Sequence, residues 1–271
     1  MSKIKIELNH VFYQFPNTKN PVFNNLNISL EDDMAINTSH LYGIIGPSGV
    51  GKTTLLSVLG GQLKPDKGTV FINSVDIYDI YDSDRRDIIA YQMQTSTNIR
   101  GNVKTNLIFG IYNGTIDKTE TNSTINSISD EHLIELLKRV GLWAIFEEKD
   151  GLNTVIGEGG LNLSGGQRQR LNFASLFLRA KHYKPVVILI DEPTASLDEI
   201  SEIEITKLIN ELSLSAVVLV VAHRLVTIAN AKGMLDMSNL NLELIHPQTK
   251  QELLISSKYF QDLQSHKLEL D

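Results

Sequence analysis

The sequence feature that most constrains the fold is a glycine-rich octapeptide, Gly46–Thr53, placed between an apolar run and a helical segment. The run Leu41–Ile45 is typical of a buried strand, and Thr53–Leu63 has the pattern of a helix. Glycines let the backbone curl so that its amides point at a polyphosphate, and the helix N-terminus adds positive charge. In this pattern Lys52 faces the β- and γ-phosphates, and the Thr53 hydroxyl can bind Mg²⁺. The segment therefore predicts a phosphate-binding loop. Its residues are Gly46, Pro47, Ser48, Gly49, Val50, Gly51, Lys52 and Thr53, and Thr54 follows them in the helix.

The remaining hydrophobic pattern predicts an α/β protein built around this loop. The continuous apolar runs Val186–Ile190 and Ala216–Val221 are typical of parallel strands that are covered on both faces. Near the start of the chain, Ile4–Leu8 alternates like a half-buried strand, and Val22–Leu30 repeats this trend. We therefore expect a P-loop NTPase core with a mixed, mainly parallel sheet, together with an N-terminal antiparallel β region.

The middle of the chain predicts an inserted α-helical lobe. Apolar residues of Asp130–Val140 share one helical face, and Gly141 follows at the position of a helix stop. The stretch Asn113–Ser129 is rich in Asn, Thr and Ser and is expected to be an exposed loop, and Glu31–His40 is polar and turn-like. The predicted division is a RecA-like core with a β subdomain at residues 1–94 and 181–271, and a helical lobe at 95–180.

Composition limits the class of protein. The chain has 271 residues, of which 42% are hydrophobic, and this suits one large globular domain with a lobe. Its net charge of -7 disfavours a nucleic-acid partner, and we expect none. Cysteine is absent, which excludes disulfides and Cys-based metal sites. Since no apolar run approaches the ~20 residues of a membrane helix, we expect a soluble or peripheral chain.

Two consecutive acids end one of the predicted buried strands. At this position in P-loop enzymes an acid holds Mg²⁺, directly or through water, and Asp191 is the candidate. Glu192 can accept a proton or hydrogen bond from an attacking water. Pro193 then stops the strand and stiffens the turn. The two acids therefore predict the metal-binding and catalytic part of the phosphate site. The alternative is two solvated acids at a strand end.

The segment Leu163–Gln167 has the pattern of a helix start that can meet a phosphate. Ser164 and Gln167 fit a capping box, while Gly165 and Gly166 let an anion approach the backbone. An apolar stripe of the following helix then supplies a buried face. From these residues alone, an ordinary capped helix is the simpler interpretation.

The phosphate loop, Leu163–Gln167 and the paired acids, in this order, resemble the ATP-binding cassette (ABC) ATPases. The resemblance extends from about Ile4 to Leu263 and implies ATP and Mg²⁺ as cofactors. In that family the second acid is catalytic, which assigns this role to Glu192. The family signature, here Leu163–Gln167, contacts the ATP that the phosphate loop of the opposite subunit holds. The resemblance therefore implies a head-to-tail dimer around two ATP molecules.

Four further positions take their roles from the resemblance. Gln94 matches the glutamine that senses Mg²⁺ and the attacking water, although Met93 stands where the family usually has proline. Asp198 matches the loop that crosses the dimer interface, and His223 matches the histidine that touches the γ-phosphate. Phe15 aligns with the aromatic that stacks on adenine, with Tyr13 as the alternative. The implied catalytic set is Glu192, His223 and Gln94, and the implied metal set is Thr53, Gln94 and Asp191.

Other segments resemble exporter-type cassettes. Thr154–Gly159 is similar to the exporter X-loop, with Glu158 at the position that contacts transmembrane coupling helices. Arg168–Arg170, Ala222–Leu225 and Thr249–Leu254 also resemble exporter segments. These similarities imply transmembrane partner subunits and a peripheral location on the cytoplasmic side of a membrane. The chain is then either a separate subunit or a fragment of a longer protein.

Other functions remain open at this stage. An import ATPase is the nearest alternative, and the X-loop argues against it. A soluble ABC protein of DNA repair or translation would need long coiled coils or a second cassette, and neither pattern is present. A catalytically silent cassette is disfavoured for a homodimer because Glu192 and His223 are both present, and a heterodimer with a degenerate partner stays open. Departures from the family pattern at 31–40, 113–129 and 229–246 leave the partner and cargo undefined.

Overall fold

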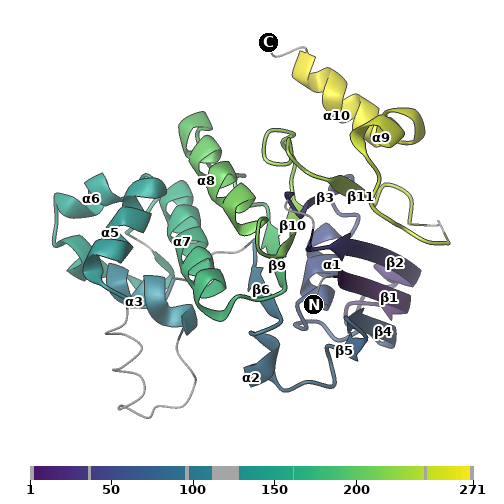
Figure 1. Cartoon of the computed structure of the whole chain (residues 1–271), viewed down its shortest axis with the longest axis horizontal. Coiled ribbons are helices and arrows are strands. Elements are labelled where there is room, and N and C mark those ends of the chain that lie inside the picture. The colour runs from purple at the N-terminus through teal and green to yellow at the C-terminus, as the bar shows by residue number, and fades with distance from the viewer. Residues whose placement is uncertain are drawn as a thin grey trace.

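The computed structural model describes residues 3–35, 38–94, 98–111, 128–160, 162–240 and 243–268. At its centre lies a five-stranded sheet, flanked by an antiparallel sheet on one side and a group of helices on the other (Figure 1). All neighbouring strands of the central sheet are parallel. In spatial order they are β11 (Gly233–Asp236), β3 (Leu41–Ile45), β10 (Val217–Val221), β9 (Val187–Asp191) and β6 (Ile89–Gln92).

The central strands are continuously apolar because both of their faces are covered. Along β9, Ile188 and Ile190 pack into one core with helices α7 (Gly165–Tyr183) and α8 (Glu199–Leu212). Val187 and Leu189 point the other way, into a second core shared with α1 (Lys52–Leu59) and the antiparallel sheet. The α/β class and the mainly parallel sheet are confirmed.

The antiparallel sheet runs in the order β2-β1-β4-β5 and covers the side of the core that holds α1. Its strands are β1 (Lys3–Tyr13), β2 (Phe23–Asp33), β4 (Lys67–Ile72) and β5 (Val75–Asp76). The β1–β2 register shifts between Leu8 and Val11, where His10 has a positive φ of 52°. The expectation of a turn from Glu31 onward is wrong at its start, because Glu31 to Asp33 pair with Lys5 to Lys3 and continue β2.

A buried ionic cluster explains why this polar segment is part of the fold. The Asp32 carboxylate lies 2.9 Å from His40 Nδ1, and it also pairs with Lys232, which directly precedes β11. Burial acts to raise the pKa of Asp32, but hydrogen bonds from Lys232, Tyr42 and His40 outweigh it and hold that pKa below its usual value. The cluster therefore joins the antiparallel sheet to the edge of the parallel sheet.

The helical group contains α3 (Val103–Ile108), α5 (Asp130–Arg139), α6 (Trp143–Glu147) and α7. Within this group, the short strands β7 (Gly101–Asn102) and β8 (Val155–Ile156) pair in antiparallel orientation. Helix α5 begins where Ser129 accepts a hydrogen bond from the His132 amide, and it buries Leu133, Leu136 and Leu137. The segment expected to be a loop insertion, 113–129, lies almost entirely outside the described residues.

Three elements lie at the margins. Helix α2 (Asp82–Arg85) precedes β6, and α9 (Lys250–Ser256) begins with a capping box between Thr249 and Glu252. Helix α10 (Lys258–Leu268) ends the described chain at one edge of the molecule (Figure 1). Within the described ranges, no helix has the combined length and hydropathy needed to cross a membrane.

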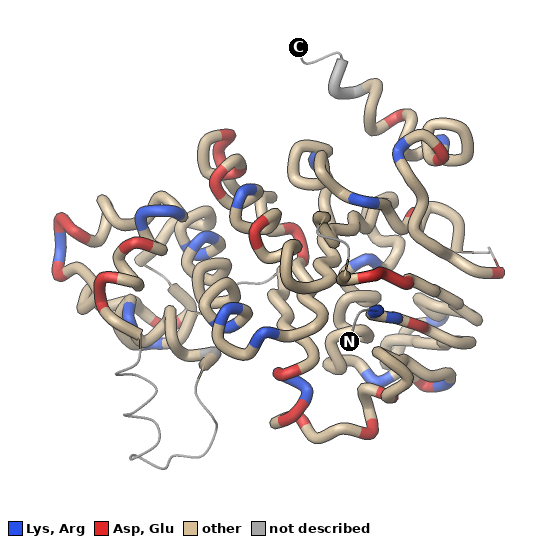
Figure 2. The backbone as a smooth tube through the Cα atoms, viewed as in Figure 1, with Lys and Arg blue, Asp and Glu red and all other residues tan. Residues whose placement is uncertain are grey.

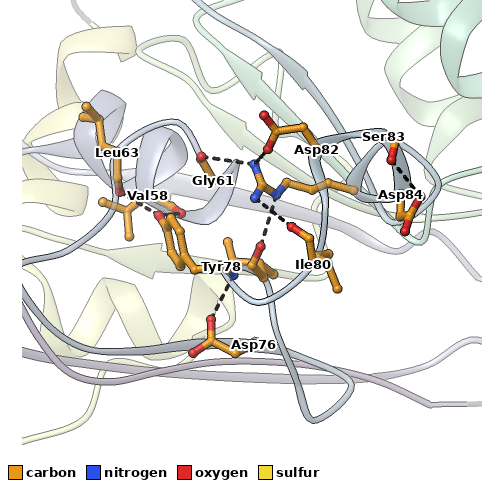
Figure 3. A network of polar contacts seen from close by, with 11 residues as sticks. Val58, Gly61, Leu63, Asp76, Tyr78, Ile80, Asp82, Ser83 and Asp84 are labelled. Atoms are coloured by element: carbon orange, nitrogen blue, oxygen red, sulfur yellow. Dashed lines mark hydrogen bonds and ion pairs between the residues drawn. The ribbon is translucent and has the colours of Figure 1, made fainter. Parts of the chain in front are cut away.

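The C-terminal end of α1 is fixed by a polar network (Figure 3). The Tyr78 hydroxyl lies 2.7 Å from the Val58 carbonyl and 2.6 Å from that of Leu63. The Arg85 guanidinium donates to the Gly61 carbonyl at 3.3 Å and pairs with Asp82 at 2.9 Å. Because a cation stabilises the negative end of a helix dipole, the network holds α1 in the orientation that presents its N-terminus to the phosphate loop.

Candidate functional site

The predicted site residues come together because the parallel strands share an edge. The phosphate loop follows β3, Asp191 ends β9, His223 follows β10 and Gln94 follows β6. They meet outside the carboxyl ends of the strands, where open α/β sheets bind ligands. The pocket there has a volume of about 430 Å³. It is lined by Phe15, Val22, Ser48, Gly49, Gly51, Lys52, Thr53, Thr54, Gln94, Glu192 and His223.

The loop itself has the curled backbone that a phosphate cradle needs. Gly51 caps α1 with φ at 106°, and a Cβ added there would lie 2.7 Å from a methyl group of Val22. Glycine is therefore required at this position. Lys52 Nζ donates to the carbonyls of Gly46, at 2.8 Å, and Pro47, at 2.9 Å. Burial lowers the pKa of Lys52, and the charges of Glu192 and Asp191 oppose this effect.

Asp191 has the properties of a metal ligand. The residue is 1% exposed, and neither carboxylate oxygen has a hydrogen-bond partner among the described residues. Burial is the main cause that raises the pKa of Asp191 to about 6, while Thr53, Lys52 and His223 act in the opposite direction. A buried carboxylate with free oxygens beside a threonine hydroxyl is a donor set that suits Mg²⁺. The residues present therefore fit the predicted metal.

Glu192 is held on both carboxylate oxygens. Gln94 Nε2 donates to Oε2 at 2.9 Å, and His223 Nε2 lies 2.8 Å from Oε1. The backbone of Glu192 has a positive φ of 48°, which is strained for a residue with a side chain. Such strain is concentrated at functional sites, and here it turns the carboxylate toward the phosphate pocket.

The aromatic residue on the pocket wall is Phe15. Its side chain is 38% exposed and lines the pocket, whereas Tyr13 is only 7% exposed. The two rings pack edge to face with centroids 5.1 Å apart. Phe15 is thus the more exposed of the two rings and the one that lines the pocket.

Ser164–Gln167 begins helix α7 with the predicted capping box. Ser164 accepts from the Gln167 amide, and Gln167 accepts from the Ser164 amide. None of these four residues lines the pocket described above.

Lys and Arg residues follow along α7 and acids follow along α8, as Figure 2 shows. Asp198 is the N-cap of α8, and hydrogen bonds from Ser201 lower its pKa.

Two contributions to the site were not predicted from the sequence. Val22 lines the pocket beside Phe15, and its position just before β2 gave no chemical signal. Gln169 belongs to the Arg168–Arg170 segment noted above only for its resemblance, but it is 8% exposed and its amide bonds both the Glu192 carbonyl and the Ser196 amide behind the pocket lining. A polar residue on an otherwise apolar helix face was the available sign of such a role.

The fold and the pocket define a P-loop nucleotide-binding domain of mixed α/β architecture. The ABC transporter family model matches residues 30–195, more than half of the chain. The chain therefore belongs to the ABC transporter family, as its ATP-binding domain.

Similar proteins agree with this assignment. A Rickettsia typhi protein named as an export ATP-binding/permease protein is 34% identical over 233 residues, covering 84% of this chain and 36% of the relative. An ABC transporter ATP-binding protein of Bacillus subtilis is 32% identical over 241 residues, covering 89% of this chain and 38% of the relative. The solved structure of a bacterial Atm1-family ABC exporter with ATP bound shares the fold, with a TM-score of 0.79 at 22% identity. It matches 98% of this chain and 42% of that chain. The chain thus spans little more than a third of these curated relatives.

Proposed function

We propose that this chain hydrolyses ATP to ADP and phosphate, and that hydrolysis powers export across a membrane through transmembrane partners. The observation that carries the proposal is the Glu192 carboxylate, bracketed by Gln94 and His223 at the edge of a phosphate pocket. Export is supported by the names of the relatives, which combine an ATP-binding part with a permease. The location that follows is peripheral, on the cytoplasmic side of a membrane.

In the proposed reaction, the chain mainly positions groups and stabilises charge. Lys52 and the loop amides bind the phosphates, and Phe15 stacks on the adenine. Thr53, Asp191 and Gln94 would hold Mg²⁺, which offsets negative charge on the transferring phosphoryl group. Glu192 accepts a hydrogen bond from the attacking water, and His223 contacts the γ-phosphate.

The site is proposed to be completed by a second cassette. Ser164 to Gln167 lie outside the lining of the pocket, yet they form a helix N-terminus with free glycine backbone, which suits an anion. A head-to-tail dimer places this N-terminus, with Asp198 near the interface, against the pocket of the other subunit. In this scheme residues 1–94 and 181–271 hold the nucleotide, and 95–180 presents the signature segment.

A groove beside the pocket is proposed to receive the transmembrane partner. It has a volume of about 250 Å³ and lies between β6, the helical group and α7. Met93 and Phe109 on its rim are 39% and 55% exposed. Because Met93 is the neighbour of Gln94, a helix docked there contacts the segment that touches Glu192. This continuity would link the membrane part to hydrolysis.

The test is co-purification from detergent-solubilised membranes of the host, with ATP hydrolysis measured on the same samples. We expect a polytopic membrane protein to co-purify with the tagged chain. In the Met93→Asp and Phe109→Asp variants, the amount of this membrane protein that is recovered should fall tenfold or more, since a buried charge costs several kcal/mol. Ile255→Asp, at an exposed position of α9, is the matched control. Recovery without any membrane protein, in a chain that hydrolyses ATP, would contradict the export part of the proposal.

A further inference from the structure

Gln169 connects helix α7 to the turn that carries Glu192. Its side-chain Nε2 donates to the Glu192 carbonyl at 2.5 Å, and its Oε1 accepts from the Ser196 amide at 3.2 Å. One side chain thus bonds two points of the turn between β9 and α8, its first residue and Ser196. Since Gln169 is only 8% exposed, water replaces these bonds poorly.

The turn that Gln169 holds is strained. Glu192 has φ at 48°, and its amide donates to the Val221 carbonyl of the neighbouring strand at 3.1 Å. A non-glycine residue in this conformation is strained and persists only when its surroundings impose it. The direction of the Glu192 carboxylate therefore depends on the contacts that fix its backbone.

The signature end of α7 also touches the same turn. A Cβ added at Gly166 would lie 2.8 Å from the Ser196 carbonyl oxygen, so helix and turn are in close contact. Gly166 and Gln169 are three residues apart and share one face of α7. Any shift of the signature helix is thus transmitted to Ser196 and, through Gln169, to the carbonyl of Glu192.

We propose that Gln169 is a positioning residue that couples the placement of the signature helix to the orientation of the Glu192 carboxylate. This inference rests on the proposed ATP hydrolysis. In the coupled state, contact of the signature segment with a nucleotide fixes α7, and Gln169 then fixes the turn. Gln169 is not among the residues that line the pocket, so its proposed effect on Glu192 acts through the backbone of the turn.

The test compares steady-state hydrolysis by wild type and Gln169→Met, which keeps the length of the side chain and removes both hydrogen bonds. We expect kcat to fall by about 10- to 100-fold, since small misplacements of a catalytic group have effects of this size, while KM for ATP changes by less than about twofold. Gln169→Glu, which keeps the acceptor for Ser196 but loses the donor to Glu192, is the second variant and is also expected to lower kcat.

Two controls separate positioning from mere stability. Asn106→Leu removes another buried amide that bonds backbone groups, here of Ile99 and Asn102, and is expected to lower the melting temperature without lowering kcat. In a Glu192→Gln background, Gln169→Met should cause no further loss of single-turnover hydrolysis, because the group it positions is gone.

An unchanged kcat in both Gln169 variants would overturn the inference. So would an equal fractional loss in the Glu192→Gln background, or a fall in kcat of the same size in Asn106→Leu. A wild-type chain that fails to hydrolyse ATP would instead contradict the proposed function, so the two failures are distinguishable.

Discussion

The Glu192→Gln variant is expected to lose ATP hydrolysis by about a thousandfold, the range in which general bases contribute. Glutamine keeps the size of the side chain and one acceptor oxygen, so the contacts with Gln94 and His223 are partly retained. It cannot take up the proton or orient water as a carboxylate does. Since the phosphate loop and the signature segment are unchanged, ATP should still bind, and the ATP-bound dimer should accumulate.

Phosphate release under single-turnover conditions measures the loss, and light scattering with and without ATP measures the dimer. Glu204→Gln is a suitable control, because Glu204 is an acid on α8 that pairs with Lys207 and is not among the residues that line the pocket. Hydrolysis by Glu192→Gln at near the wild-type rate would show that the catalytic assignment is wrong.

The second large effect is expected from Asp191→Asn, and it concerns both stability and magnesium. The pKa of Asp191 is raised from 3.8 to about 6, mainly by burial. A raised carboxylate pKa means that the folded state binds this proton more tightly than the unfolded state. The contribution of protonated Asp191 to the free energy of unfolding is therefore fully present below pH 4 and is lost as the pH rises through 6. The free energy of unfolding falls by about 3 kcal/mol as a result.

Asparagine removes this pH-dependent penalty. In the absence of nucleotide and Mg²⁺, we expect Asp191→Asn to unfold at the same denaturant concentration as wild type near pH 4, and to be more stable by up to about 3 kcal/mol at pH 8. The same variant should lose most Mg²⁺-dependent hydrolysis, because a carboxylate ligand is gone. Urea unfolding of both proteins at pH 4 and pH 8 measures the difference. If the difference in the free energy of unfolding between the variant and wild type were the same at pH 4 and at pH 8, this would contradict the assignment of Asp191 as a buried, unpaired carboxylate.

Much of the fold could be predicted from the sequence because local patterns and tertiary structure agree. The runs that form β9 and β10 are continuously apolar because both faces of these strands are covered, as expected, and alternate residues enter different cores. The phosphate loop was readable because its glycines permit the curled backbone, and because the strand and helix that flank it are local patterns as well. The capping box of α7 was readable because it needs only residues three positions apart.

The parts that could not be predicted depend on long-range contacts. The polarity of Glu31–His40 indicated a surface turn, but Asp32 is buried and pairs with Lys232, which lies 200 positions later in the chain. Local patterns carry no trace of such a partner. In the site, the choice between Phe15 and Tyr13 depends on which ring faces the pocket. The bulge at His10 interrupts the alternation of side chains along β1, so the sequence pattern does not predict which ring this is. The role of Gln169 likewise appears only when α7 and the turn after β9 are brought together.

Each ATP site is proposed to be shared between the phosphate loop of one cassette and the signature segment of another. Mixing two variants, each of which is expected to be inactive by itself, tests this sharing. Lys52→Ala removes the phosphate-loop cation. Gly165→Asp places a negative charge at the signature helix N-terminus, and because a Cβ there would meet no atom within 4 Å, we expect the variant to fold.

In a mixed head-to-tail dimer, the intact phosphate loop of the Gly165→Asp chain faces the intact signature of the Lys52→Ala chain. We expect phosphate release from an equal mixture to reach about a quarter of the wild-type rate, because half of the dimers are mixed and each has one complete site. A mixture that remains as inactive as its components, while wild type hydrolyses ATP in the same buffer, would contradict a shared site.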